Sequence, residues 1–246
     1  MSEPQVFADP EALAQHAADW LLAWASATAA KEGERFSVCL SGGSTPKRLY
    51  ELLAAKPRRD AFPWARAHWF WGDERFVPPD DRLSNYRMVR EAMFDHVPVP
   101  AANIHPIPTL GVTPEQAAKA YERELQLFHG EEVLHPDRPL FNVVLLGLGT
   151  NGHTASLFPG MQVLDERTQW TGTMTDPEAG TRITLTYPAL ESAREVAFLV
   201  AGKDKRAVLA EILGGKSALP AAQLHPKGTL RFLVDRAAAP EALSRS

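Results

Sequence analysis

Cysteine is nearly absent from this 246-residue chain, which contains only Cys39. A single cysteine excludes an intramolecular disulfide and a metal site built from several cysteines. Cys39 lies in the apolar run Ser37-Val38-Cys39-Leu40, which favours a buried strand residue over a nucleophile. The histidines are scattered without the spacing typical of metal ligands, so the sequence predicts no metal site.

Long hydrophobic runs are also missing. No apolar stretch approaches the roughly 20 residues needed to span a bilayer, and the N-terminal region lacks the basic and apolar segments of a secretory signal. The formal net charge of −4 argues against a nucleic-acid binder, which normally has a basic surplus. We therefore expect a cytoplasmic protein that binds neither membranes nor nucleic acids, although a few local cations suffice to bind one phosphate.

The sequence instead contains a regular alternation of apolar runs and helical patterns. Apolar runs bounded by turn signals indicate strands buried on both faces; they are Phe36–Leu40, Ala67–Trp71, Phe141–Leu146, Val196–Ala201 and Leu230–Val234. One helical pattern opens after Asp9. Four others cover Pro46–Ala55, Ser84–Phe94, the segment from a capping box at Thr113 to about Phe128, and Lys203–Leu213. The alternation predicts an α/β fold, with a doubly wound, mainly parallel sheet, helices on both faces and a single domain over residues 1–246.

Ligands of open parallel sheets bind at the carboxyl ends of the strands, so the turns that follow the apolar runs are candidate sites. The first, Ser41–Pro46, contains Gly42 and Gly43 and leads into a helix. Free amides and the helix dipole form an anion site there, and Ser44 and Thr45 add hydroxyl donors. A tight turn with a Ser or Thr cap explains the same residues equally well.

The second turn, Gly72–Arg75, brings two acids and an arginine to the end of a predicted strand. Asp73 and Arg75 are candidates for positioning a polar substrate, but a solvated charged loop is the simpler reading of this turn taken alone. Downstream, Ser84 and Asn85 begin a predicted helix, and Ser84 is a candidate cap.

The third turn, Gly147–Ser156, matches the dinucleotide-binding pattern GxGxxG. We reject that function because the motif lies past the middle of the chain, and because Pro159 cuts short the helix that the fingerprint requires. No cofactor is therefore predicted. What remains is His153 beside a glycine-rich backbone, and histidine is the side chain best suited to act as a general base near neutral pH.

A fourth region supplies cations. Arg182 begins a short alternating strand, and Lys205 opens a helix after a predicted buried strand. These two charges complement a phosphate held by the first turn. Ordinary surface charge is the alternative, and it fits the neighbouring Lys203 and Arg206 better.

Together these segments resemble the 6-phosphogluconolactonase family, within the wider group that includes glucosamine-6-phosphate deaminases. The motifs occur in the family's order over nearly the whole chain: SGGSTP (Ser41–Pro46), WGDERFVPPDDRLSNY (Trp71–Tyr86), LGLGTNGHTASLFPG (Leu146–Gly160), RITLTYPAL (Arg182–Leu190) and AGKDK (Ala201–Lys205). The resemblance implies hydrolysis of a phosphosugar lactone by a monomer or weak homo-oligomer.

The resemblance also implies roles for individual residues. The 6-phosphate is expected at Gly42, Gly43, Ser44 and Thr45 together with Arg182 and Lys205. Asp73 and Arg75 are expected to line the sugar side of the pocket, and Asn85 to help shape it. His153 is expected to activate water against the lactone carbonyl. Asn151 stands where the family usually has an aspartate, so it brings no charge that favours a protonated imidazole, and it leaves open which group orients His153.

A glucosamine-6-phosphate deaminase is the main rival. The run Thr154–Gly160 after the histidine, and Arg75-Phe76-Val77-Pro78 in the acidic turn, are similar to the lactonases instead. A phosphosugar-binding regulator is a further rival, but the roughly 35 residues before the first predicted strand leave no room for the usual helix-turn-helix. No GxSxG serine motif is present, which favours direct attack by water.

Overall fold

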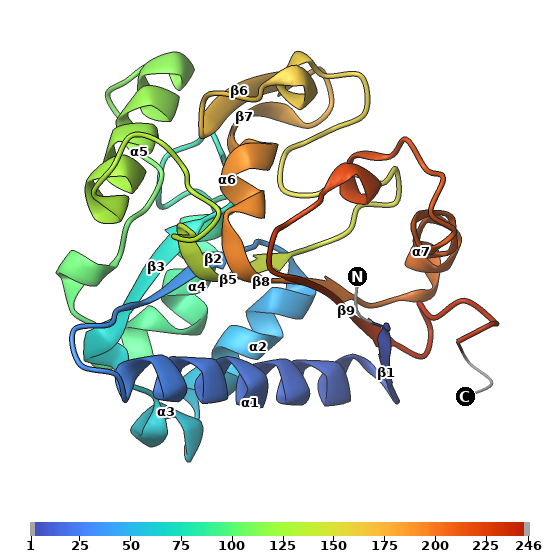
Figure 1. Cartoon of the computed structure of the whole chain (residues 1–246), viewed down its shortest axis with the longest axis horizontal. Helices are drawn as coiled ribbons and strands as arrows, with labels where there is room; N and C mark the ends of the chain where they lie inside the picture. The colour runs from blue at the N-terminus through green and yellow to red at the C-terminus, as the bar shows by residue number, and fades with distance from the viewer. Residues whose placement is uncertain (1–2, 244–246) are drawn as a thin grey trace.

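A computed structural model describes residues 3–243 (Figure 1). Its strands are β1 (Gln5–Phe7), β2 (Phe36–Leu40), β3 (Ala67–Trp71), β4 (Asp73–Arg75), β5 (Phe141–Leu146), β6 (Thr171–Asp176), β7 (Gly180–Leu185), β8 (Ala193–Val200) and β9 (Thr229–Asp235). Its α-helices are α1 (Pro10–Ala29), α2 (Ser44–Ala54), α3 (Arg58–Ala61), α4 (Asn85–Ala92), α5 (Pro114–His129), α6 (Tyr187–Glu191) and α7 (Arg206–Leu213). Short 3₁₀ turns, including Lys203–Lys205 before α7, link several of them.

The main sheet has the strand order β1-β9-β8-β5-β2-β3, and its neighbouring strands pair in parallel. All five predicted apolar runs fall in it, and every residue of β2 and β5 is buried. The run predicted as Val196–Ala201 is corrected at both ends, because β8 begins at Ala193 and ends at Val200. The predicted α/β class with a parallel sheet is confirmed.

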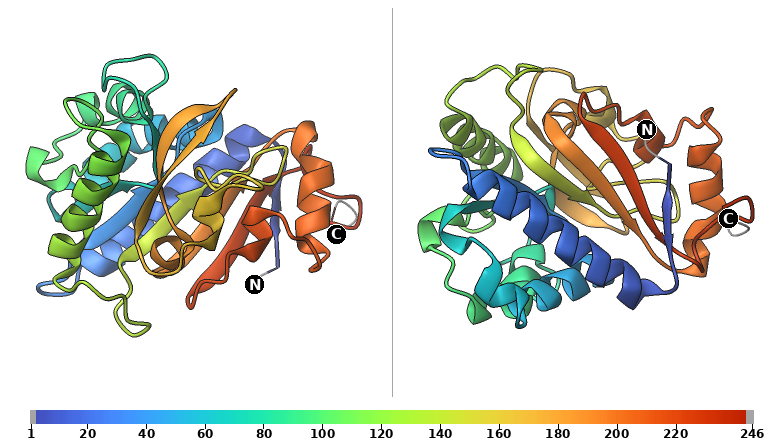
Figure 2. Two further views of the ribbon diagram at one scale, coloured as in Figure 1. Left: turned by 90° about the horizontal axis from the view of Figure 1, so that it is seen from above. Right: turned by 60° about the horizontal axis from the view of Figure 1, so that its bottom comes forward.

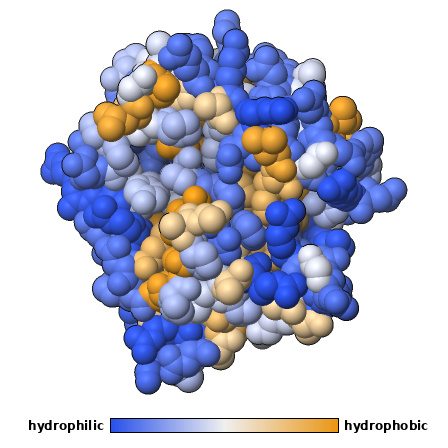
Figure 3. Space-filling model, turned by 90° about the vertical axis from the view of Figure 1, so that its left-hand side faces the viewer, coloured by the Kyte–Doolittle hydropathy of each residue, from blue (hydrophilic) through white to orange (hydrophobic). Residues whose placement is uncertain are grey.

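Helices cover both faces of this sheet, as predicted. α1 and α2 pack together against one face, whereas α5 and the strands β6 and β7 lie on the other side (Figures 1 and 2). The expected caps are present: Asp9 accepts the amide of Ala12 at 2.8 Å, and Thr113 and Gln116 form a capping box. The large apolar side chains fill the interior, while the face shown in Figure 3 is mostly hydrophilic with apolar residues in separate groups.

A second, antiparallel sheet with the order β4-β7-β6 was not predicted. Its strands are short or polar, and β4 is the charged segment Asp73–Arg75, so they lack the apolar runs that mark the main sheet. The alternative of a solvated charged loop at Gly72–Arg75 is therefore excluded, since Asp73 and Glu74 are buried in a strand. Asp73 pairs with Thr184, and Arg75 pairs with Arg182.

The chain changes direction within the main sheet between β2 and β5. From β2 it proceeds outward to β3, and it then returns to the other side of β2 and continues through β5, β8 and β9. Such a switch point leaves a crevice at the carboxyl ends of the strands, where ligands of open α/β sheets bind. The turns after β2 and β5, which contain Gly42 and His153, flank this crevice. Across residues 3–243, no helix combines the length and the apolar character that a membrane crossing requires.

Two buried tyrosines hold the strand ends at this edge. The Tyr50 hydroxyl accepts the amide of Ser41 at 3.1 Å and donates to its carbonyl at 2.8 Å. The hydroxyl of Tyr121 on α5 likewise accepts the amide of Trp71 at 2.8 Å and donates to the Trp71 carbonyl at 3.0 Å. β3 is an edge strand, so the Tyr121 hydroxyl satisfies backbone groups that a neighbouring strand would otherwise pair.

We predict that Tyr121→Phe lowers the free energy of unfolding by about 1–3 kcal/mol, because it leaves two buried backbone groups without their partner. Urea unfolding measures the change. Tyr86→Phe is a matched control, because the Tyr86 hydroxyl makes no hydrogen bond within residues 3–243. Equal stability losses in the two variants would contradict the role assigned to Tyr121.

Candidate active site

A pocket of about 300 Å³ lies at the carboxyl ends of β2, β5 and β8, beside β4 and β7. It brings together all nine residues predicted to bind substrate, and His153 with them: Gly42, Gly43, Ser44, Thr45, Asp73, Arg75, Asn85, His153, Arg182 and Lys205. These residues come from six stretches of the sequence, at positions 42–45, 73–75, 85, 153, 182 and 205. Asn151 does not line the pocket and contacts His153 instead.

One wall of the pocket is built to receive an anion. α2 starts at Ser44, and its N-cap residue Gly43 has no side chain to occupy the first helical amides. Lys205 and Arg182 line the same pocket. The helix start supplies amide donors and the positive end of the helix dipole, so this wall combines oriented donors with full positive charge.

Arg75 and Arg182 are direct cross-strand partners in the small sheet. Like charges placed opposite each other are destabilising. Burial lowers the pKa of Arg182 from its ordinary value; Asp73 opposes that change, and Arg75 reinforces it. Two cations that line one pocket in this way are suited to bind an anion, which would offset their mutual repulsion.

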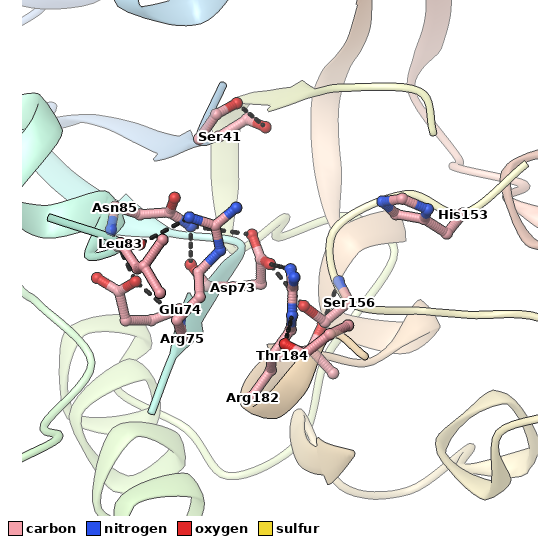
Figure 4. Close-up of polar contacts among 12 residues, drawn as sticks. Ser41, Asp73, Glu74, Arg75, Leu83, Asn85, His153, Ser156, Arg182 and Thr184 are labelled. Carbon is pink, nitrogen blue, oxygen red and sulfur yellow. Dashed lines mark hydrogen bonds and ion pairs between the residues drawn. The ribbon is translucent and has the colours of Figure 1, made fainter. Parts of the chain in front are cut away.

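Asp73 supplies the negative charge of the site and is itself buried. Its carboxylate accepts a hydrogen bond from the Ser156 hydroxyl at 2.6 Å and lies 3.8 Å from Nη1 of Arg182. Asn85 Nδ2 donates to the Asp73 carbonyl at 3.0 Å and to Oδ1 at 3.4 Å (Figure 4). Asp73 therefore links β4 to the start of α4, to β7 and to the turn that holds His153.

Asn85 also explains why residue 42 is glycine. A Cβ atom at Gly42 would lie 2.1 Å from Oδ1 of Asn85. The carboxamide of Asn85 thus fits directly against the backbone of the first turn, and it shapes the pocket as predicted.

Glu74 organises the neighbouring helix. Its buried carboxylate accepts the amides of Arg75, Asn85 and Tyr86, each at 2.8 Å, and the Ser84 hydroxyl at 3.0 Å. Burial raises the pKa of Glu74, and the three amides oppose the rise. Ser84 is the N-cap of α4, as expected, and accepts the amide of Arg87 at 3.1 Å.

Asn151 orients the imidazole of His153. Its Oδ1 lies 2.5 Å from Nδ1 of His153 and accepts the backbone amide of the same residue at 3.2 Å. An amide oxygen only accepts hydrogen bonds, so Nδ1 carries the proton and Nε2 of the neutral ring has a free lone pair. This arrangement answers the question of the orienting partner that the sequence left open.

The surroundings of His153 favour its neutral form. Burial lowers the pKa of His153 from its ordinary value of 6.5, and the cations Arg182, Lys205 and Arg75 lower it further. The Asp73 carboxylate opposes these effects and raises it. A neutral imidazole with a free Nε2 is able to take a proton from water at neutral pH.

Three residues of this network were missed by the sequence reasoning. Ser156 and Thr184 are fully buried, and the amide of Ser156 donates to the Thr184 hydroxyl at 3.2 Å. Ala155 lines the pocket with a φ of 47°, a conformation that non-glycine residues rarely adopt and that is concentrated at functional sites. Ser156 and Ala155 follow His153 closely in sequence, which was the one available signal.

A parallel α/β sheet that presents a base and several cations at its switch point defines an enzyme that acts on a small anion. Residues 8–232 match the family model described as glucosamine-6-phosphate isomerases/6-phosphogluconolactonase. The chain belongs to this family.

The relatives point to one branch of it. The chain is 42% identical over 240 residues to a 6-phosphogluconolactonase of Nostoc sp., covering 96% of this chain and 97% of that protein. It is 45% identical over 205 residues to a 6-phosphogluconolactonase of Synechocystis sp., covering 82% of each. Among solved structures, a 6-phosphogluconolactonase from Trypanosoma cruzi superposes with a TM-score of 0.82 at 30% identity, covering 97% of both chains.

We predict that Asp73→Asn lowers the pKa of His153, because the substitution removes a nearby negative charge that raises it. NMR titration of the imidazole in the ligand-free protein measures the change. Asp204→Asn is the matched control, since that exposed carboxylate pairs with Lys205 but does not line the pocket. An unchanged or raised pKa in Asp73→Asn would contradict the electrostatic account of the site.

Proposed function

We propose that the chain hydrolyses 6-phospho-D-glucono-1,5-lactone to 6-phosphogluconate, a step of the oxidative pentose phosphate pathway. The observation that carries the proposal is the free Nε2 of a neutral His153 in the same pocket as an anion-binding wall. The named relatives support the same reaction. A phosphorylated lactone requires both features, one to bind the phosphate and the other to activate water.

In the proposed mechanism, His153 Nε2 accepts a proton from water while the water oxygen attacks the lactone carbonyl carbon. The bond between this carbon and the ring oxygen then breaks, and the imidazolium returns the proton to the departing oxygen. The result is a carboxylic acid and a free hydroxyl, which together contain the atoms of the lactone and one water. In this proposal the Arg75 guanidinium, which lines the pocket, stabilises the negative charge that develops on the carbonyl oxygen.

The substrate phosphate is proposed to bind at Gly42–Thr45, Arg182 and Lys205, and the sugar is proposed to lie toward Arg75 and Asn85. The structure suggests a narrower role for Asp73 than direct contact with the sugar, because both of its carboxylate oxygens already have protein partners. In this proposal Asp73 sets the charge and geometry of the site.

We further propose that the protein acts in the cytoplasm as a monomer or weak homo-oligomer, without a cofactor or a nucleic-acid partner. The net charge of −4 supports the last point. Direct attack by water needs no electron carrier.

We predict that His153→Ala lowers turnover of the lactone at least about 100-fold, the scale of general base catalysis, with little change in affinity for a phosphate ligand. Acid release from fresh substrate, corrected for spontaneous hydrolysis, measures turnover. His225→Ala is the control, because His225 is exposed and outside the pocket.

Near-wild-type turnover in His153→Ala would place the base elsewhere. Ammonia release from glucosamine-6-phosphate is assayed in parallel with the wild-type protein. Ammonia release without lactone hydrolysis would assign the chain to the deaminase branch of the family.

We also predict that Arg182→Ala and Lys205→Ala reduce the preference for phosphorylated over plain gluconolactone. Loss of a charge-assisted contact of this kind costs about 2–5 kcal/mol of binding. Lys203→Ala is the matched control, because Lys203 is exposed and does not line the pocket. Undiminished discrimination in both variants would remove these residues from the phosphate site.

A further inference from the structure

Phe158 lies directly against the proposed base. Its ring is stacked on the imidazole of His153, with 4.1 Å between the ring centroids and 9° between the planes. The guanidinium carbon of Arg182 lies 5.4 Å from the centroid of the same ring. Phe158 is half-buried, so its ring is only partly enclosed by the core. It is therefore in contact with both the base and a cation of the anion-binding wall.

The imidazole also packs closely against the backbone. A Cβ atom at Gly149 would lie 2.1 Å from Nδ1, 2.2 Å from Cε1 and 2.8 Å from Cγ of His153, so the ring occupies the space that a side chain at residue 149 would need. The imidazole is therefore in close contact with both the Phe158 ring and the Gly149 backbone.

The imidazole is thus constrained by three contacts. The Phe158 ring is stacked on it, the Gly149 backbone packs closely against it, and Asn151 holds Nδ1. Nε2 is the ring nitrogen left for a reacting water. A general base works only within hydrogen-bond reach of the proton it removes, and a displacement of about 1 Å is enough to cost on the order of 100-fold in rate.

Phe158 also acts on Arg182. A guanidinium within about 6 Å of an aromatic ring is attracted by the negative face of that ring. Arg182 needs such support because its cross-strand partner is Arg75, and because its distance of 3.8 Å from Asp73 is long for an ion pair. One aromatic ring therefore fixes the positions of a base and a cation that must act on the same substrate.

We propose that Phe158 is a positioning residue that sets the plane of the His153 imidazole and the place of the Arg182 guanidinium relative to each other. The expected effect on kinetics rests on the proposed lactone hydrolysis. The expected effect on the position of the imidazole does not. Phe158 acts through its flat face, so another flat ring preserves its role and an aliphatic side chain of similar bulk does not.

NMR tests the structural part without any turnover. Ring protons of His153 that lie over Phe158 are shielded, so at least one of them resonates upfield of an exposed histidine in the wild-type protein. Phe158→Leu is expected to shift that signal downfield, and Phe158→Tyr to keep it. The signal is assigned by its loss in His153→Ala. An unshifted wild-type signal, or one that Phe158→Leu leaves in place, would overturn the proposal.

Kinetics test the functional part. Phe158→Leu is expected to lower kcat on the order of 10-fold through the loosened imidazole and to raise KM about two- to fivefold through Arg182. Phe158→Tyr is expected to restore both to within about twofold of wild type. Phe128→Leu is the matched control, because Phe128 is also half-buried and also packs on histidine rings, those of His68 and His105, outside the pocket.

The outcomes separate the two proposals. Equal kinetic losses in Phe158→Leu and Phe158→Tyr would show that the flat ring is not what matters. Wild-type kinetics in Phe158→Leu would show that the stack has no effect on the reaction. Either result overturns the role of Phe158. Absence of lactone hydrolysis in the wild-type protein refutes the proposed function, and the NMR comparison then decides the stack alone. If Phe158→Leu does not fold, the His153 ring signals of the wild-type protein and Phe158→Tyr are compared instead. An unshifted signal in the wild-type protein, or one that moves downfield in Phe158→Tyr, would then overturn the proposal.

Discussion

The buried carboxylate of Asp73 is the interaction on which the site depends. It joins the start of α4 through Asn85, the turn that bears His153 through Ser156, and β7 through Arg182. A buried charge is tolerated when it is paired and hydrogen-bonded, and Asp73 has both kinds of partner. The same charge raises the pKa of His153. The geometry of the pocket and the protonation state of its base therefore have a common origin.

The remaining charges in the pocket are positive, and they work together with burial. A cation-rich pocket keeps an imidazole neutral, which a general base requires, while it attracts a phosphorylated substrate. Asn151 completes this arrangement, because its carboxamide fixes the tautomer of His153 without adding a negative charge that would favour the imidazolium. One distribution of charge thus both attracts the phosphorylated substrate and keeps the imidazole of His153 neutral.

Much of the fold could be predicted because parallel strands buried on both faces leave continuous apolar runs, as at Phe36–Leu40 and Phe141–Leu146. The small sheet could not, because the charged β4 is stable only when β7 pairs with it. The pocket residues were found from their place after strands and from the family resemblance. The contact between Asp73 and Ser156 was not, because 83 positions separate them and only the folded chain brings them together.

In the proposed mechanism, the ionisation of His153 controls lactone hydrolysis. The acidic limb of the kcat/KM profile reports the pKa of the essential base in the free enzyme, and NMR titration reports the pKa of the His153 imidazole directly. The two values are expected to coincide and to lie below the ordinary histidine value of 6.5. A kinetic pKa that differs from that of His153, or an imidazole that titrates above 6.5, would contradict this mechanism.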